Sequence, residues 1–259
     1  MYANYHTHTW RCHHAQPDEN SYVRAAISRG LKILGFSDHT PDPFSKGFHS
    51  GFRMEPEMLP DYCRTIEALK GQYRDSIRIE IGLEAEYYPK YFKELKALLR
   101  DTPVTYLLLG QHYVGNETDG VYSGTPTADP ETLKAYCRQT RDGMQTGLFT
   151  YLAHPDLLYF TGNDRLYRQE MSGLFQDAKS CGMPLEVNLL GLSDRRHYPS
   201  KRFLELAAEE NCPVIFGCDA HEPGALSDTS PEDQAKKLIA PYGLTLLNEI
   251  PLRNIQNHL

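Results

Sequence analysis

The sequence predicts an α/β fold in which parallel strands close into a barrel. Short apolar segments of strand length alternate with longer segments of helical periodicity along the whole chain. About seven such strand–helix units occur, and a parallel sheet built from them is expected to curl and close on itself. Histidines and acidic residues directly follow several apolar segments, and βα barrels carry their chemistry at the carboxyl ends of the strands.

The predicted strands end in side chains that can bind metal ions. The first strand closes with His6-Thr7-His8, and a late strand closes with Asp219-Ala220-His221. Successive side chains in a strand alternate faces, so residues two apart project to the same side and can hold one ion or two adjacent ions. The strands between them end in further candidate ligands: Ile33 to Ser37 before Asp38-His39, Ile77 to Leu83 before Glu84, Tyr106 to Gln111 before His112, and Phe149 to Ala153 before His154.

Segments with helical periodicity separate the strands and carry helix start and stop signals. Gly30 follows the first of them, and Pro89 and Pro130 open two others. A further helix is predicted from Ser227, followed by a mostly apolar stretch over 244–247 that could cover the barrel. The main predicted helices span Ser21 to Arg29, Glu55 to Gln72, Pro89 to Arg100, Pro130 to about Met144, Arg165 to Lys179, and Ser200 to Glu210.

Each of these polar residues has an ordinary structural interpretation when it is taken alone. A His-Thr-His sequence near a chain start is compatible with surface or hydrogen-bonded histidines, and Asp38 or Glu84 could simply satisfy backbone groups where a strand ends. Their convergence at one barrel mouth changes this interpretation, because buried imidazoles and carboxylates are costly without partners. Cations neutralise such a cluster, so together the residues predict a metal site.

The residues around the candidate ligands form motifs in a definite order: His6-Thr7-His8, Ser37-Asp38-His39, Gly82-Leu83-Glu84, Gln111-His112, Ala153-His154-Pro155 and Gly217-Cys218-Asp219-Ala220-His221. Nearly from end to end, the chain resembles the polymerase and histidinol phosphatase (PHP) superfamily of metal-dependent phosphoesterases. It is most similar to the histidinol-phosphatase branch, because Thr40-Pro41 leads to Arg53-Met54 and because Glu84 is followed by Ala85-Glu86-Tyr87.

The resemblance implies a distorted seven-stranded βα barrel over residues 1–259, a single domain, with three divalent metal ions at the carboxyl ends of its parallel strands. Glu84 would bridge two ions. His14 rather than His13 is implied as a ligand, since family members place it six residues after the second histidine of the opening motif. Asp38 is expected to orient His39 through its other ring nitrogen. The implied ligand sets are His6, His8, Glu84 and Asp219 for the first ion, His14, His39 and His221 for the second, and Glu84, His112 and His154 for the third.

The resemblance further implies hydrolysis of a small phosphate monoester, with L-histidinol phosphate as the leading substrate. A hydroxide held between two divalent ions is available at neutral pH, because metals lower the pKa of bound water and stabilise charge as the ester breaks. Imidazole and carboxylate ligands suit zinc, manganese or iron. The leaving alkoxide would be protonated by Asp219 or by a histidine such as His197. The alternatives are another phosphorylated substrate within the superfamily (a sugar phosphate, nucleotide or phosphoprotein) and a non-catalytic metal-binding module.

Phosphate binding requires cationic donors beyond the metals, and arginine matches two phosphate oxygens at once. The histidinol-phosphatase branch commonly has an arginine directly after the Gly-Leu that follows its sixth strand, whereas this chain has Gly191-Leu192-Ser193. A second family arginine, shortly after the His154-Pro155-Asp156 segment, is also replaced. Arg53, Arg195 and Arg196 are therefore the candidate substrate-binding arginines, with ordinary surface positions as the alternative.

The composition suits an enzyme with a small-molecule substrate and argues against several other classes. A chain of 259 residues is an ordinary length for one βα barrel. A net charge of -7 and a pI near 5.9, with no basic run, argue against nucleic-acid binding. No segment is long and apolar enough to span a bilayer, and the first residues lack the pattern of a signal peptide. We therefore expect a cytoplasmic protein whose cysteines, Cys12 among them, are thiols used for packing.

Overall fold

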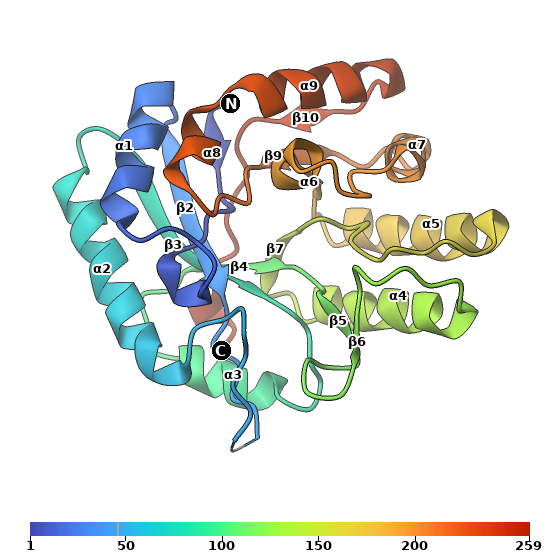
Figure 1. The fold of residues 1–259 in the computed structure, drawn as a ribbon, viewed down its shortest axis with the longest axis horizontal. Coiled ribbons are helices and arrows are strands. Elements are labelled where there is room, and N and C mark those ends of the chain that lie inside the picture. Colours follow the sequence, from blue (N-terminus) through green and yellow to red (C-terminus); the bar gives the residue numbers. More distant parts are fainter. Residues whose placement is uncertain (46) are drawn as a thin grey trace.

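The strands that the structure describes form one curled sheet in which every neighbouring pair is parallel, in the order β1-β2-β3-β4-β7-β8-β9-β10 (Figure 1). The structure is a computed structural model and describes residues 1–45 and 47–259. The strands are β1 (Ala3–Asn4), β2 (Ile33–His39), β3 (Arg78–Ala85), β4 (Tyr106–Leu109), β7 (Phe149–Leu152), β8 (Leu185–Asn188), β9 (Val214–Gly217) and β10 (Leu246–Leu247).

The ends of the curled sheet meet through the segments that follow β1 and β9. The His8 backbone N–H donates to the Ala220 carbonyl at 2.9 Å, and the Ala220 N–H donates to the His6 carbonyl at 3.2 Å. This parallel contact lies at the carboxyl ends of the strands, whereas β10 pairs with the first residues of β9. The predicted α/β barrel of parallel strands is confirmed as a fold class. The described sheet has eight strands rather than the seven implied, because the apolar stretch over 244–247 contributes the short β10.

The longer helices lie on the outside of the curled sheet (Figure 1). The predicted helix from Glu55 begins as a 3-10 turn over Pro56–Met58 and becomes α2 at Leu59, because Pro60 lacks a backbone N–H and is tolerated only in a first turn. None of the described helices is long and apolar enough to cross a membrane. The helices are α1 (Glu19–Arg29), α2 (Leu59–Gln72), α3 (Phe92–Leu99), α4 (Pro130–Gln145), α5 (Asp164–Ser180), α6 (Leu189–Ser193), α7 (Lys201–Glu209), α8 (Pro223–Ser227) and α9 (Ser230–Ile239).

Two hydrophobic layers support the barrel. The larger layer packs the helices against the sheet, and the smaller one fills the barrel interior with Tyr5, Tyr106, Tyr151 and aliphatic side chains. The Tyr106 hydroxyl lies 2.8 Å from the Tyr5 carbonyl and 3.1 Å from the Phe36 carbonyl, to which it donates. A Cβ atom at Gly82 would lie 2.3 Å from Tyr106 Cε1, so this glycine in β3 leaves the space for the ring. The barrel is therefore a packed core rather than a channel.

An antiparallel hairpin follows β4. Its strands are β5 (Tyr113–Val114) and β6 (Val121–Tyr122). The Ser123 backbone N–H donates to the His112 carbonyl at 2.7 Å, and the Ser123 hydroxyl donates to the Gln111 carbonyl at 3.0 Å. These bonds anchor the hairpin beside the carboxyl end of β4, where it brings two tyrosines to the rim of the barrel mouth.

Candidate metal centre

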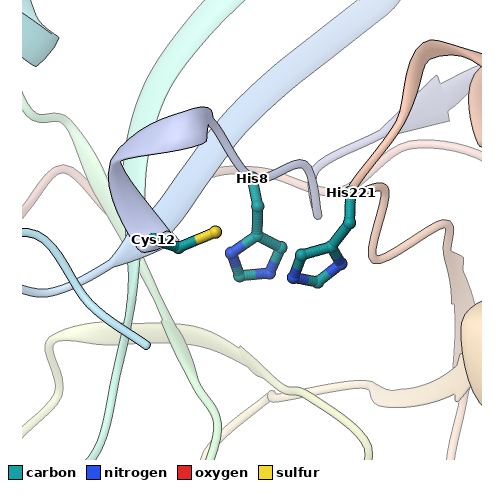
Figure 2. Close-up of side chains that lie close together, drawn as sticks. All are labelled: His8, Cys12 and His221. Carbon is teal, nitrogen blue, oxygen red and sulfur yellow. The ribbon is translucent and has the colours of Figure 1, made fainter. Parts of the chain in front are cut away.

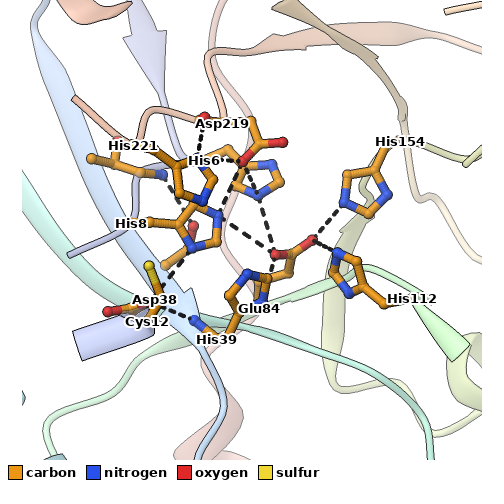
Figure 3. A network of polar contacts seen from close by, with 12 residues as sticks. His6, His8, Cys12, Asp38, His39, Glu84, His112, His154, Asp219 and His221 are labelled. Atoms are coloured by element: carbon orange, nitrogen blue, oxygen red, sulfur yellow. Dashed lines mark hydrogen bonds and ion pairs between the residues drawn. The ribbon is translucent and has the colours of Figure 1, made fainter. Parts of the chain in front are cut away.

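The metal-binding side chains predicted from sequence converge at the carboxyl ends of the strands (Figure 3). This convergence follows from the parallel topology, because every strand of the barrel ends at the same rim. His6 and His8 follow β1, His39 ends β2, Glu84 lies near the end of β3, His112 follows β4, His154 follows β7, and Asp219 and His221 follow β9.

Glu84 lies at the centre of the cluster, and its two carboxylate oxygens face different imidazoles. Oε1 lies 2.7 Å from His154 Nε2 and 3.8 Å from His112 Nε2. Oε2 lies 3.4 Å from His6 Nε2 and 3.2 Å from His39 Nδ1. This arrangement suits a carboxylate that bridges two cations.

Asp219 forms the opposite side of the cluster. Its Oδ1 lies 3.1 Å from His8 Nε2 and 3.6 Å from His6 Nε2, so one imidazole pair and one carboxylate oxygen can share an ion. His14, His39 and His221 form a second group whose ligand atoms lie within 4.8 Å of one another. The structure thus brings His14 into the cluster.

Several buried polar atoms of this cluster have no hydrogen-bond partner among the described residues. Buried polar groups are normally satisfied, so such orphaned atoms require an explanation. A divalent cation bound by imidazole nitrogens and carboxylate oxygens supplies the missing partner, and the donor set therefore fits metal ions. The orphaned atoms that face the cluster are His6 Nε2, His8 Nε2, His39 Nδ1, Glu84 Oε2 and His221 Nε2, and the Nδ1 atoms of His8 and His154 also have no hydrogen-bond partner.

The ionisable side chains of the cluster shift one another's pKa values. Burial opposes ionisation of Glu84, but the surrounding histidines, His112 first, hold the pKa of this carboxyl well below its usual range. Burial and the charge of His8 lower the pKa of His221 to about 3. Burial disfavours the charged form of His8 as well, yet Asp219 and Asp38 raise its pKa to about 9. A metal ion bound by His8 would displace this proton, as metal binding generally does.

Glu186 contacts the candidate metal centre and was missed by the sequence reasoning. Its Oε1 accepts from His6 Nδ1 at 2.8 Å, which leaves His6 Nε2 free to face the cluster. Its Oε2 accepts from the backbone N–H of His154 at 2.9 Å and from Asn188 Nδ2 at 2.9 Å. A Cβ atom at Gly217 would lie 1.8 Å from this carboxylate. A single acidic residue inside the otherwise uncharged, buried strand β8 was the sequence signal that could have identified it.

Asp38 does not orient the His39 ring, contrary to our expectation. Its carboxylate accepts from the backbone N–H groups of Thr9 at 3.2 Å and of His39 at 2.9 Å. Its Oδ1 lies 3.5 Å from His8 Nδ1, so it is His8 that Asp38 contacts. The physical reason is that neighbouring side chains in strand β2 project to opposite faces.

Cys12 lies next to the His8 ring, with His221 on the other side of it (Figure 2). Its Sγ and one nitrogen of each histidine lie within 4.8 Å of one another. Cys12 is fully buried, and burial raises the pKa of its thiol, which favours the protonated form. The arrangement is compatible with the packing role expected from the sequence.

A cavity of about 460 Å³ opens above the cluster. His14, His39, Glu84 and Asp219 contribute to its floor. Its walls are largely aromatic, and the hairpin supplies two of the rings. The Phe52 and Tyr113 rings stack with centroids 6.0 Å apart, and the Tyr113 and Tyr122 centroids are 5.5 Å apart. The wall rings are Phe52, Tyr113, Tyr122 and Tyr198.

The structure separates the three candidate arginines. Arg196 lines the cavity, where its Nη1 donates to the Tyr198 hydroxyl at 2.9 Å and its Nη2 donates to Asp194 at 2.8 Å. Arg195 is exposed and does not line this cavity. Arg53 is buried behind the cavity wall and is bonded to carboxylates, which contradicts both the phosphate-binding expectation and the surface alternative.

His197 also lies outside the lining of the cavity. Its ring stacks on Tyr159 with centroids 4.2 Å apart, and its Nε2 lies 2.8 Å from the Leu157 carbonyl. A proton donor must reach the leaving oxygen in the cavity. The expectation that His197 protonates the leaving group is therefore at odds with its position.

A parallel α/β barrel with clustered imidazoles and carboxylates at its strand ends defines a barrel protein with a candidate metal centre. The PHP domain family matches residues 4–190, so the chain belongs to that family. The chain is similar to the probable histidinol-phosphatase of Deinococcus radiodurans, with 28% identity over 236 residues that cover 85% of this chain and 86% of that protein. It is also similar to the histidinol-phosphatase of Bacillus subtilis, with 26% identity over 255 residues, or 85% of this chain and 93% of that protein.

A solved structure has the same fold. It is the histidinol phosphate phosphatase of Lactococcus lactis complexed with zinc, L-histidinol and phosphate. It matches with a TM-score of 0.74 and 20% sequence identity, covering 96% of this chain and 98% of that chain. The predicted family and the predicted fold class are confirmed by these comparisons.

Proposed function

We propose that this chain is a metal-dependent phosphoric monoester hydrolase whose substrate is L-histidinol phosphate. The observation that carries the proposal is the position of Glu84, whose two oxygens face separate groups of imidazoles beneath an open cavity. A buried carboxylate in this position suits a bridge between cations, and a cavity above them leaves room for a substrate. The relatives named histidinol-phosphatase support the choice of substrate.

We propose three divalent ions, zinc, manganese or iron, bound by the ligand sets implied by the family. When bound, such ions lower the pKa of water and stabilise negative charge on phosphoryl oxygens. Zinc has the support of the Lactococcus lactis complex. The ligands are His6, His8, His14, His39, Glu84, His112, His154, Asp219 and His221, and the imidazoles and carboxylates among them suit all three metals.

Arg196 is the proposed phosphate-binding residue. It is the arginine of the three candidates that lines the cavity, and its guanidinium is held in place by Tyr198 and Asp194. The planar guanidinium can donate to two phosphate oxygens at once. Burial raises the pKa of Tyr198, so its phenol stays protonated beside the cavity and can donate a hydrogen bond.

Asp219 is the proposed proton carrier. It borders the cavity, and its Oδ1 lies 3.1 Å from His8 Nε2. An ionised carboxylate there can accept a proton from the attacking water and then deliver it to the leaving oxygen of the ester. In this reaction the water oxygen bonds to phosphorus, the P–O ester bond breaks, and the alcohol leaves with the proton.

The cavity walls support an aromatic leaving group that carries positive charge. Phe52, Tyr113 and Tyr122 present ring faces and edges, which suit the imidazole of histidinol. Asp194 lies on the same wall as Arg196 and can face the ammonium group of the substrate. The arginine that the family commonly has directly after Gly191-Leu192 is absent from this chain. For this reason another phosphorylated small molecule or a phosphoprotein is the second candidate substrate.

We also infer that residues 1–259 form one barrel domain. The first and last strands, β1 and β10, belong to the same sheet. The ammonium group of Met1 forms an ion pair with Glu232 at 2.6 Å, and Arg29 pairs with the same carboxylate at 2.5 Å. Both ends of the described chain are therefore integrated into one structure. Limited proteolysis that releases a stable fragment from either side of the barrel would contradict this.

Phosphate release from a substrate panel tests the proposed function. The panel holds L-histidinol phosphate, a sugar phosphate, a nucleotide and phosphotyrosine, and elemental analysis is done on the same sample. We expect a kcat/KM on the order of 10⁴ M⁻¹s⁻¹ or more for L-histidinol phosphate. Full metal occupancy with higher activity on another member would replace the substrate, and full occupancy without any turnover would favour a metal-binding module.

Two variants separate the metal site from the rest of the chain. Glu84→Ala should lose bound metal and phosphate release together, because its carboxylate faces both groups of imidazoles. His258→Ala is the control, since this residue is exposed near the end of the chain and far from the cluster in sequence. Full turnover by a metal-depleted Glu84→Ala sample would contradict the mechanism.

A further inference from the structure

A buried cluster of charges lies behind one of the metal-binding histidines. This Arg53 cluster consists of Arg53, Asp42, Glu86 and Glu117, and each of the four side chains is at most 5% exposed. Arg53 Nη2 donates to Glu86 Oε1 at 2.9 Å, and Nη1 donates to Glu86 Oε2 at 3.1 Å. Nε donates to Glu117 at 2.7 Å, and Nη1 also donates to Asp42 at 3.0 Å.

Glu86 connects this cluster to the metal site through His112. Glu86 Oε1 lies 2.8 Å from His112 Nδ1, so the other ring nitrogen, Nε2, faces Glu84 Oε1 at 3.8 Å. A carboxylate bonded to one nitrogen of an imidazole fixes both the tautomer and the orientation of the ring. His154 faces the same Glu84 oxygen, but its Nδ1 has no hydrogen-bond partner among the described residues. Of these two histidines, it is therefore His112 whose ring is hydrogen-bonded to a charged side chain.

The position of Glu86 in turn depends on Arg53. A buried carboxylate is costly unless it is paired and hydrogen-bonded, and the two-point bond to the guanidinium provides that pairing. Arg53 joins three loops, since Asp42 follows β2, Glu86 follows β3, and Glu117 lies in the β5–β6 hairpin. Arg53 itself does not line the cavity above the metal cluster. Any effect of Arg53 on the metal site must therefore pass through its partners.

We propose that Glu86, held by Arg53, is a positioning residue that determines the occupancy of the ion site formed by Glu84, His112 and His154. The inference rests on the proposed metal cluster and deepens it. Loss of such a support typically lowers metal affinity by about 10- to 100-fold. The remaining ions should be retained, because the bonds of Glu86 run to His112 and Arg53 and not to their ligands.

The test compares Glu86→Gln with Glu117→Gln. Each variant removes one of the negative charges that surround the buried Arg53 guanidinium, but Glu86 contacts His112 and Glu117 does not. Bound Zn²⁺ per chain is measured by elemental analysis after dialysis, and Zn²⁺ affinity is measured by chelator competition. We expect Glu86→Gln to hold about one ion fewer than wild type, with about a 10- to 100-fold loss of affinity at that site. Glu117→Gln should match wild type.

A double-mutant cycle separates positioning from general support of the loops. His112→Ala should lose the same ion, and adding Glu86→Gln to it should cause no further loss, because the proposed effect acts through His112. Additive losses in the double variant, or equal Zn²⁺ binding by the Glu86 and Glu117 variants, would overturn the inference while leaving the proposed function intact. A wild-type protein that binds no divalent ion would overturn both.

Arg53→Lys provides a second route if Glu86→Gln does not fold. Lysine keeps the positive charge, but its single ammonium group cannot reproduce the two-point bond to Glu86. We expect a folded protein, by circular dichroism, that loses the same ion. A folded Arg53→Lys protein with wild-type Zn²⁺ content would show that His112 does not depend on this support.

Discussion

Gly110 tests whether Glu84 must lie where the structure has it. The glycine follows β4 and faces the Glu84 side chain on the neighbouring strand β3. A Cβ atom at Gly110 would lie 2.0 Å from Glu84 Oε1 and 2.7 Å from its Cδ. Gly110 is not among the residues with a positive φ. The substitution Gly110→Ala therefore acts through this steric contact alone.

The size of the effect follows from these distances. Cβ contacts in proteins are essentially never shorter than 3.0 Å, so the carboxylate must move by about 1 Å or more. Glu84 is buried, and its Oε1 lies 2.7 Å from His154 Nε2, so the movement breaks the arrangement that faces the proposed ions. A misplacement of about 1 Å in an active site can cost about 10²-fold in rate. Overpacking should also destabilise the fold by about 1–3 kcal/mol.

Phosphate release, bound metal per chain and denaturant unfolding measure these effects. Gly71→Ala is the matched control, because Gly71 lies in α2 and a Cβ atom added there would meet no heavy atom within 4 Å outside its own stretch of helix. This control should keep full activity and gain about 0.5–1 kcal/mol of stability. Wild-type metal content and kcat/KM in Gly110→Ala would refute the reasoning, since Glu84 could then act from a displaced position.

Three further predictions concern the surroundings of the site. Glu186→Gln should lower metal affinity by about 10- to 100-fold in chelator competition, because His6 loses its charged support; unchanged affinity would contradict this. Burial raises the pKa of Asp42 to about 7, so between about pH 4 and 7 the unfolded chain loses this proton while the folded protein keeps it. The folded state therefore becomes less stable as pH rises through that window, and the stability of Asp42→Asn relative to wild type should increase. Tyr106→Phe should cost about 1–2 kcal/mol in urea unfolding and leave bound metal unchanged; lost metal would argue against a purely supporting role.

Local patterns in the sequence predicted the fold class and the converging ligands. Apolar strand segments and amphipathic helices are properties of neighbouring residues, so their alternation indicates a parallel barrel without knowledge of contacts. The positions of His39, His112 and His154 follow in the same way, because residues at the carboxyl ends of parallel strands meet at one rim. The family motifs added the grouping of these residues, including His14, which the structure brings beside His39 and His221.

Tertiary structure alone decided which side chains support the candidate ligands and which arginines face the cavity. Glu186 reaches His6 across 180 positions of sequence, and no periodicity predicts such a contact. Arg53 and Arg196 were equivalent candidates in the sequence, yet one is enclosed by carboxylates and the other lines the cavity. The sequence by itself thus determined the elements and the chemistry at their ends, because both depend on local residue order. The partners of each side chain depended on distances between remote segments, and these exist only in the folded chain.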